Sequence, residues 1–411
     1  MRTANNNPFS PGSDVIPEVW AGRVEQLSDW RDVLRPRLLI GKPERGRTIL
    51  GEPGLGKSSL VQKIADSARD SGDWVTPQLR IPSGTDPLKR VATAVLDLAA
   101  QAGLPARREK TIATALARVE AVAVSGIGLT LRAQDGPEPY TALTELLIEI
   151  GKAALSQGHV VLVHIDEVQN ITDEAVLSQL LVALGDALTT TTTVTVLGGE
   201  KVSRGLPIGV YLTGLPDFAE AAAALKGATF ARRFKTTTLS GIADDDLEAA
   251  LQQFVLHGWE VADGNGGIAR IRMNPEAAEA IVSLCVGEPF LFQLAGERAW
   301  YAGTGPTITA EEVYRGWLGA EQEAASHVER VIDRLPERER AFLAAMASLP
   351  PDERTLSRIA EEAGFAKVTA AGTTSARLDT KRGIISRGRP YAFRHRAIGA
   401  YLTTDWPSPP R

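Results

Sequence analysis

The chain has 411 residues, 44% of them hydrophobic, and a formal net charge of −5. This length allows about two to three domains with sizeable cores. The acidic balance excludes a general attraction to nucleic acid or anionic membranes, so any basic surface must be local. Cys285 is the only cysteine, which excludes an internal disulfide and a cysteine-cluster metal site.

Three features of the sequence predict the cellular compartment of the protein. The first residues, MRTANNNPFSPGSD, lack the apolar core of a signal peptide. No apolar run is long enough to span a bilayer. A single cysteine fits a reducing compartment. We therefore expect a cytoplasmic protein with no membrane partner.

A glycine-rich loop lies between a predicted strand, 48–50, and a predicted helix, 58–68. Its residues fit G-x-x-x-x-G-K-[ST] at every fixed position: Gly51, Glu52, Pro53, Gly54, Leu55, Gly56, Lys57 and Ser58. In such a loop backbone N–H groups surround the phosphates, the lysine bridges the β and γ oxygens, and the hydroxyl ligates Mg²⁺. The pattern predicts that the loop and the adjoining Ser59 bind ATP or ADP, with Ser58 as a magnesium ligand.

A second apolar stretch, VVLVHIDE at 160–167, ends in two carboxylates. A Mg-nucleotide needs such an acidic contact at the end of a neighbouring strand. We expect Asp166 to hold magnesium through water and Glu167 to polarise the attacking water, a feature typical of a hydrolase. His164, within this strand, is predicted to be a packed core histidine.

A third strand, within PIGVYLTGLPDF at 207–218, ends on Thr213. In ring-forming and related P-loop ATPases, a polar side chain here reaches the γ-phosphate. It does so from a strand that lies between the strand before the glycine-rich loop and the strand that ends in the two carboxylates. Arg232 and Arg233 follow a predicted helix and precede a Thr-rich β run. They either face a neighbouring subunit's nucleotide and stabilise developing charge, or are surface arginines favoured by a helix C-terminus.

These motifs resemble, in their order, AAA+ and STAND-type P-loop ATPases, and within them the origin-initiator-like (Orc-like) group. The N-terminal VIPEVWAGRVEQL looks like the entry box of that group, with Gly22 and Arg23 lining the adenine side of the site. VGEPFLFQLAG at 286–296 looks like its Gly-x-Pro element, which implies that Gly287 and Pro289 approach the base. The resemblance covers most of the chain.

The sequence also departs from that group. A second-sensor arginine is not securely placed, and Arg298 is the nearest option. The stretch 189–207 is longer than a simple connection and predicts a β-hairpin that could present Lys201 or Arg204 to a partner. Between the strand before the glycine-rich loop and the strand at 160–167, apolar residues of 110–122 recur at helical spacing. Residues 123–135 then alternate like a short hairpin.

Residues 240–333 are predicted to be helical. Residues 334–411 are predicted to form three helices and then a two-strand turn, which is the order of a winged helix-turn-helix. From Arg377 to Arg396 the chain carries seven Lys or Arg residues against one acid, Asp379. With Tyr391 and Phe393 interleaved, these charges could contact duplex DNA. The alternatives are a solvated face, or a winged helix that binds protein or packs on the ATPase core.

We therefore expect an α/β P-loop NTPase with a parallel sheet core, a helical lid and a C-terminal winged helix. The predicted divisions are an N-terminal entry segment (1–45), a P-loop nucleotide-binding domain (46–239), a helical lid (240–333) and a winged helix-turn-helix domain (334–411). The predicted function is an ATP-hydrolysing switch that uses Mg²⁺ and repositions the winged helix to load or remodel a DNA-bound complex. The alternative is a STAND-type signalling or defence switch, in which the winged helix binds protein and ATP drives homo-oligomerisation.

Overall fold

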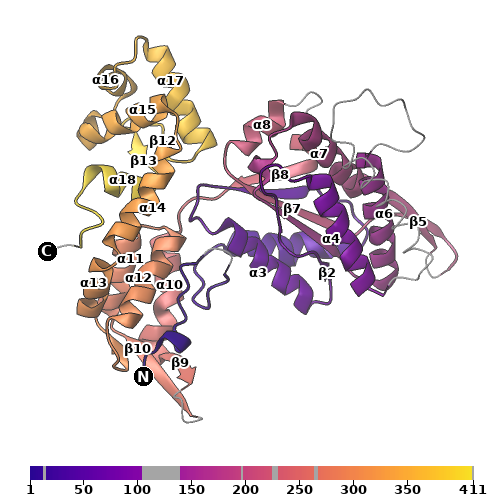
Figure 1. The fold of residues 1–411 in the computed structure, drawn as a ribbon, viewed down its shortest axis with the longest axis horizontal. Coiled ribbons are helices and arrows are strands. Elements are labelled where there is room, and N and C mark those ends of the chain that lie inside the picture. Colours follow the sequence, from indigo (N-terminus) through magenta and orange to yellow (C-terminus); the bar gives the residue numbers. More distant parts are fainter. Residues whose placement is uncertain (13–14, 104–138, 196–197, 225–229, 263–266, 410–411) are drawn as a thin grey trace. The chain divides into compact units, whose positions relative to one another are not determined.

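The structure is a computed structural model that describes residues 1–12, 15–103, 139–195, 198–224, 230–262 and 267–409 (Figure 1). The chain separates into two compact units. The sheet unit comprises 24–50 and 60–237, and the lid unit comprises 1–23, 51–59 and 238–411. The predictions for 110–122 and 123–135 lie outside the described residues.

The sheet unit is built on a six-stranded sheet in the order β2-β4-β7-β1-β8, with β3 also paired to β4. Its strands are β1 (Gly46–Leu50), β2 (Trp74–Val75), β3 (Leu79–Arg80), β4 (Val161–Asp166), β7 (Ile208–Gly214) and β8 (Phe234–Thr238). The pairs β1–β7, β2–β4, β3–β4 and β4–β7 are parallel. The predicted parallel core is therefore confirmed, and β7 lies between β1 and β4 as expected.

The central strands are continuous apolar runs because both faces of the sheet are covered. Every residue of β4 and of β7 is buried. The register places Ile165 opposite Leu212 and Ile49 opposite Thr213. Since parallel strands end at the same edge, the carboxyl ends of β1, β4 and β7 meet there. The glycine-rich loop follows β1 directly in the chain.

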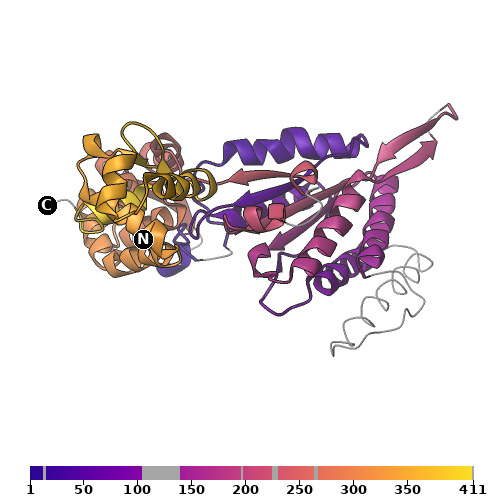
Figure 2. The same ribbon diagram turned by 90° about the horizontal axis from the view of Figure 1, so that it is seen from above.

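Helices cover both faces of this sheet (Figure 2). Helices α4, α6 and α7 share one hydrophobic core with β4 and β7, and α3 lies on the other face. The helical elements are α1 (Val24–Ser28), η2 (Asp29–Leu34), α2 (Arg35–Leu39), α3 (Lys57–Asp70), α4 (Pro87–Gln101), α6 (Pro139–Gln157), η3 (Val168–Asn170), α7 (Glu174–Thr189), α8 (Phe218–Ala224) and α9 (Phe230–Arg233).

The predicted β-hairpin before the third strand is confirmed. Strands β5 (Thr191–Thr195) and β6 (Lys201–Gly205) pair antiparallel, with Thr193 opposite Ser203. Their side chains alternate between exposed and half-buried, as expected for a two-stranded ribbon open to solvent. The hairpin extends beyond the main sheet in both views (Figures 1 and 2).

The lid unit is mainly helical, and its first part contains a small sheet in the order β11-β10-β9. Up to residue 333 its elements are η1 (Ala4–Asn6), α10 (Asp244–Gln252), η4 (Gln253–His257), β9 (Trp259–Ala262), β10 (Ile268–Met273), α11 (Pro275–Cys285), α12 (Pro289–Tyr301), β11 (Thr307–Ile308), α13 (Ala310–Leu318) and α14 (Glu321–Asp333). Helix α13 begins with a capping box, in which Thr309 and Glu312 exchange hydrogen bonds.

The last part of the lid unit, 337–403, is called the C-terminal segment below. It contains α15 (Glu337–Ser348), η5 (Pro351–Glu353), α16 (Leu356–Glu362), α17 (Val368–Ala376), η6 (Arg377–Lys381), β12 (Ile385–Ser386), β13 (Ala392–Phe393) and α18 (Arg396–Thr403). Three helices followed by an antiparallel strand pair match the predicted order. One hydrophobic core runs from α10 through to α18. The predicted boundaries at 240 and 334 remain predictions.

No helix within the described ranges is both long and apolar enough to cross a membrane.

Candidate functional site

The glycine-rich loop, 51–56, follows β1 and precedes α3 in the chain, and the loop itself belongs to the lid unit. Gly54 and Gly56 have φ values of +85° and +75°, a region that glycine adopts without steric penalty. The Lys57 ammonium is buried and donates to the backbone oxygen of Glu52 at 3.0 Å. The loop therefore has the curled backbone and the inward lysine that its sequence predicts for phosphate binding.

Helix α12 begins against this loop, as the Gly-x-Pro prediction requires. The backbone N–H of Phe290 donates to the Gly54 oxygen at 3.2 Å. A Cβ placed on Gly56 would lie 3.8 Å from the Cβ of Pro289. Gly287 has a φ of +81°, and its oxygen accepts from the Ile242 N–H at 2.7 Å. Gly287 and Pro289 thus lie near the loop, and their contact with a base remains a prediction.

The predicted entry box also contacts the loop. Arg23 Nη2 donates to the Leu55 oxygen at 2.9 Å, and Trp20 Nε1 donates to the Gly22 oxygen at 3.0 Å. Burial lowers the pKa of Arg23 to about 10, although Glu288 and Asp246 oppose this shift. Arg23 remains charged at neutral pH and adds a cation beside the loop.

Glu52, the second residue of the loop, is 2% exposed. Two arginines from distant parts of the chain lie against its carboxylate, Arg334 at 3.3 Å and Arg382 at 3.6 Å. Burial raises the pKa of Glu52, and the charges of Arg382 and Arg334 counter this effect. The sequence did not identify this contact, because G-x-x-x-x-G-K-[ST] places no constraint on the side chain at the second position.

Glu288, just before α12, forms a second buried charge cluster beside the loop. Its carboxylate lies 2.8 Å from His395 Nε2 and 3.7 Å from His327 Nε2. Burial alone would raise the pKa of Glu288, but the two histidines outweigh it and lower the pKa to about 2. Burial opposes protonation of His395, yet mainly Glu288 raises its pKa above 6.5. Gly54 has no room for a side chain, since a Cβ would lie 2.4 Å from His327 Cε1.

In the sheet unit, the acidic end of β4 is held by a buried hydrogen-bond chain. Asp166 is 1% exposed and accepts from the Thr213 hydroxyl and from the Gln78 amide. Thr213 Oγ1 lies 3.2 Å from His164 Nε2. Because the Thr213 proton goes to Asp166, His164 must donate to Thr213. His164 is buried as predicted, but it also orients Thr213, which the sequence did not suggest.

Glu167 follows directly and begins a turn. Its backbone is left-handed, with φ 58° and ψ 39°. Its N–H donates to Asp166 Oδ1 at 2.9 Å, and its carboxylate accepts from the Gln169 amide. Thus the structure brings together the predicted Asp166, Glu167 and Thr213. The loop residues 51–59 belong to the lid unit, and assembly of both groups into one site remains a proposal.

The donors present fit a magnesium ion that is held largely by nucleotide. Within the described ranges, no three His, Cys, Asp or Glu side chains gather into a metal cage. Mg²⁺ characteristically takes one or two protein ligands and completes its shell with water and phosphate oxygens. Ser58 and Asp166 are a hydroxyl and a carboxylate of the kinds that such an ion takes, and their use by one magnesium ion remains a prediction.

The two predicted arginines differ in their surroundings. Arg233 Nη1 lies 2.7 Å from Asp186 and 3.4 Å from the backbone oxygen of Val182, both on α7. Arg232 is exposed and has no hydrogen bond or ion pair among the described residues. Arg232 is therefore the better candidate to reach another subunit. Arg298, the candidate second sensor, pairs with Glu323 at 2.9 Å in the lid unit, and its sensor role remains a prediction.

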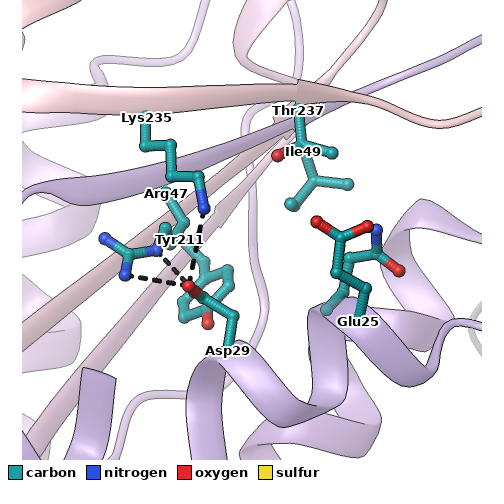
Figure 3. A pocket seen from close by; sticks show the side chains of 8 residues that line it. Glu25, Asp29, Arg47, Ile49, Tyr211, Lys235 and Thr237 are labelled. Atoms are coloured by element: carbon teal, nitrogen blue, oxygen red, sulfur yellow. Dashed lines mark hydrogen bonds and ion pairs between the residues drawn. The ribbon is translucent and has the colours of Figure 1, made fainter. Parts of the chain in front are cut away.

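The sheet unit also has a pocket between η2 and the strands (Figure 3). Arg47 Nε donates to Asp29 at 2.6 Å, and Lys235 Nζ lies 3.6 Å from the same carboxylate. Arg47 lies near the start of β1, whereas the glycine-rich loop follows its end. The lining residues are Glu25, Gln26, Asp29, Arg47, Ile49, Tyr211, Lys235 and Thr237. We assign this pocket a structural ion pair, separate from the predicted phosphate site.

Comparisons with known proteins agree with this geometry. Residues 19–197 match the family model of the AAA ATPase domain. No curated protein matches the chain. The ORC2 protein of Aeropyrum pernix, solved as ADPNP-ADP complexes, is similar in structure, with a TM-score of 0.53 and 16% identity over 95% of each chain. The Walker-type ATPase paby2304 of Pyrococcus abyssi has a TM-score of 0.53 and 14% identity, covering 93% of this chain and 96% of that one.

The Glu288 cluster predicts a specific pH dependence of stability. The pKa of Glu288 is lowered from 4.5, so its stabilisation is present above pH 4.5 and is lost as pH falls towards 2. The pKa of His395 is raised from 6.5, so its stabilisation is present below 6.5 and is lost as pH rises through the raised value. Glu288→Gln should lower the unfolding free energy by about 1–3 kcal/mol, most strongly between these limits.

Denaturant unfolding at acidic, intermediate and alkaline pH checks this. Glu279→Gln is the matched control, because Glu279 is an exposed residue of α11 whose side chain has no hydrogen bond or ion pair with any residue that the structure describes. A loss of stability in Glu288→Gln that is the same at every pH would contradict the ion-pair assignment.

Proposed function

We propose that this ATPase, which carries an AAA ATPase domain on an Orc-like fold, is a switch whose C-terminal segment responds to the nucleotide at the glycine-rich loop. The observation that carries the proposal is the contact of Glu52 with Arg382 and Arg334. Arg382 follows η6 of the C-terminal segment, and Arg334 follows α14. The loop that binds phosphate is thus directly ion-paired to the part that would move.

Binding of ATP would act on this contact through charge. Lys57, whose ammonium is bonded to the Glu52 backbone, would turn to the β and γ oxygens. The phosphates would bring several negative charges close to Glu52 and compete for its arginines. Since a buried ion pair is strongly destabilised when its charge balance changes, ATP would weaken the hold on the C-terminal segment and ADP would weaken it less.

Hydrolysis would return the switch to its starting state. Glu167 would accept a proton from water as the water oxygen attacks the γ-phosphorus, and Asp166 would hold Mg²⁺. Thr213 and Lys57 would contact the γ-phosphate. Arg232 would contribute from a neighbouring copy, which makes homo-oligomerisation by the ATP form part of the proposal.

The ion pairs favour a C-terminal segment that acts through protein contacts, the STAND-like alternative. Two of the seven basic residues, Arg377 and Arg382, pair with buried Glu339. Tyr391 is buried and packs near Phe342, with ring centroids 6.1 Å apart. Arg354 lies over the Phe393 ring. Buried Tyr391 and half-buried Phe393 thus pack against other parts of the lid unit.

Duplex DNA remains a second candidate partner because the antiparallel pair β12–β13 carries exposed arginines. Arg387, Arg389 and Arg394 are exposed. Arg387 and Arg394 pair with Asp379 at 3.2 and 2.6 Å, but exposed pairs of this kind are weak and can exchange for phosphate. Arg389 has no ion-pair partner within the described part of the chain. These three arginines would form a small phosphate-binding surface on the β12–β13 pair.

Glu52→Gln tests the switch. It removes the charge from the loop and keeps the side-chain shape and the Arg382–Glu339 pair. We expect release of bound fluorescent ADP to slow, by up to about tenfold, because the Glu52 carboxylate competes with the phosphates for these arginines and a buried charged contact contributes about 1–3 kcal/mol. Stopped-flow release with Glu353→Gln, an exposed paired glutamate of the same unit, as control measures this. Lys57→Ala should not bind nucleotide. An unchanged release rate in Glu52→Gln would refute the coupling.

The DNA candidate is tested by the salt dependence of binding. Arg387→Ala with Arg389→Ala should reduce the slope of log affinity against log salt by about 1.8, since each phosphate contact contributes about 0.9. Fluorescence anisotropy with a short duplex measures the slope, and Arg315→Ala with Arg358→Ala, both outside the basic stretch, is the control. An unaltered slope, or no binding by the wild-type protein, would rule out the β12–β13 pair as a DNA contact.

A further inference from the structure

Gln169 lies two residues after Glu167, in the short helix η3 that follows β4. Both ends of its side-chain amide are bonded. Nε2 donates to the Glu167 carboxylate at Oε2, and Oε1 accepts from the Leu215 backbone N–H at 3.1 Å. An amide presents one donor group and one acceptor group, which a carboxylate or an aliphatic side chain cannot do. Gln169 therefore connects Glu167 to the residue just beyond β7.

The backbone of this turn is fixed independently of Gln169. Glu167 has a left-handed conformation, which is uncommon for residues other than glycine, and such residues concentrate at functional sites. The Asn170 N–H donates to the Glu167 oxygen at 2.9 Å, and the Asn170 amide donates to the Ile81 oxygen at 2.9 Å. With the backbone fixed, the orientation of the Glu167 carboxylate depends on its side-chain torsions, which the Gln169 bond restrains.

The end of β7 is shaped to receive Gln169. A Cβ on Gly214 would lie 2.7 Å from Gln169 Oε1 and 2.9 Å from Val168 Cγ2. A side chain at 214 would therefore push the turn away. Thr213, the residue before this glycine, donates to Asp166. Hence the ends of β4 and β7 are joined twice, once through Thr213 and Asp166 and once through Gln169 and Glu167.

We propose that Gln169 is a positioning residue for hydrolysis, which orients the Glu167 carboxylate relative to the end of β7. This inference rests on the proposed role of Glu167. With Oε2 held by Gln169, Oε1 is left to accept the proton of the attacking water. The water oxygen then bonds to the γ-phosphorus, and the bond from that phosphorus to the bridging oxygen breaks. Its electron pair leaves with ADP.

Gln169→Met tests this role, since methionine has similar length and no hydrogen-bonding amide. We expect kcat for ATP hydrolysis to fall about tenfold or more, with KM within about twofold, because a misplaced base slows the chemical step without weakening binding. Gln179→Met on α7 is the matched control, because Gln179 is half-buried and has no side-chain partner among the described residues.

Gln169→Glu gives a readout that a purely structural role would not move. Glutamate keeps an acceptor for the Leu215 N–H but cannot donate to Glu167 when ionised. Two adjacent carboxylates raise the pKa of the pair, so the acid limb of the kcat profile should move to higher pH. If Gln169→Met does not fold, as judged by its unfolding temperature, this profile decides the question.

Glu167→Gln separates failure of the inference from failure of the proposed function. An inactive Glu167→Gln together with normal or raised kcat in Gln169→Met would overturn the positioning role and leave the role of Glu167 intact. The same holds for an unmoved pH profile in Gln169→Glu. Normal turnover in Glu167→Gln would instead overturn the assignment of Glu167 itself.

Discussion

The buried carboxylate of Glu52 is the constraint on which the lid unit depends. A carboxylate that is 2% exposed is stable only with compensating charge, and here the charge comes from Arg334 and Arg382. Arg382 also pairs with Glu339, so the loop, the end of α14 and the C-terminal segment share one set of charges. A change of charge at the glycine-rich loop would therefore alter the pairing of the other members, which is the physical basis of the proposed switch.

The sheet unit positions the residues proposed to act in hydrolysis by different means. Its central strands are buried on both faces, so their ends are held rigidly by packing. Hydrogen bonds then fix the polar residues that follow: His164 orients Thr213, Thr213 bonds to Asp166, and Gln169 bonds to Glu167. Charge balance links the glycine-rich loop to the C-terminal segment within the lid unit, whereas packing and directional hydrogen bonds fix the strand ends of the sheet unit.

Sequence patterns were sufficient for features with local signals. The glycine-rich loop, the β4 and β7 strands, the hairpin at 191–205 and the helix order of the C-terminal segment all have short-range periodicity or fixed spacing. The partners of Glu52 have no such signal, because Glu52 and Arg334 are 282 residues apart. The basic stretch shows the same limit, since the sequence gives the number of charges but not that Glu339 and Asp379 pair with several of them.

The central claim is that nucleotide at the glycine-rich loop controls the C-terminal segment, and hydrogen exchange tests it most directly. Backbone amides of 377–403 would be compared in the wild-type protein without nucleotide, with ADP and with a non-hydrolysable ATP analogue. The account predicts lower protection with the ATP analogue than with ADP, because the γ-phosphate weakens the Glu52 contact. Equal protection in both nucleotide states, with both nucleotides bound, would contradict it.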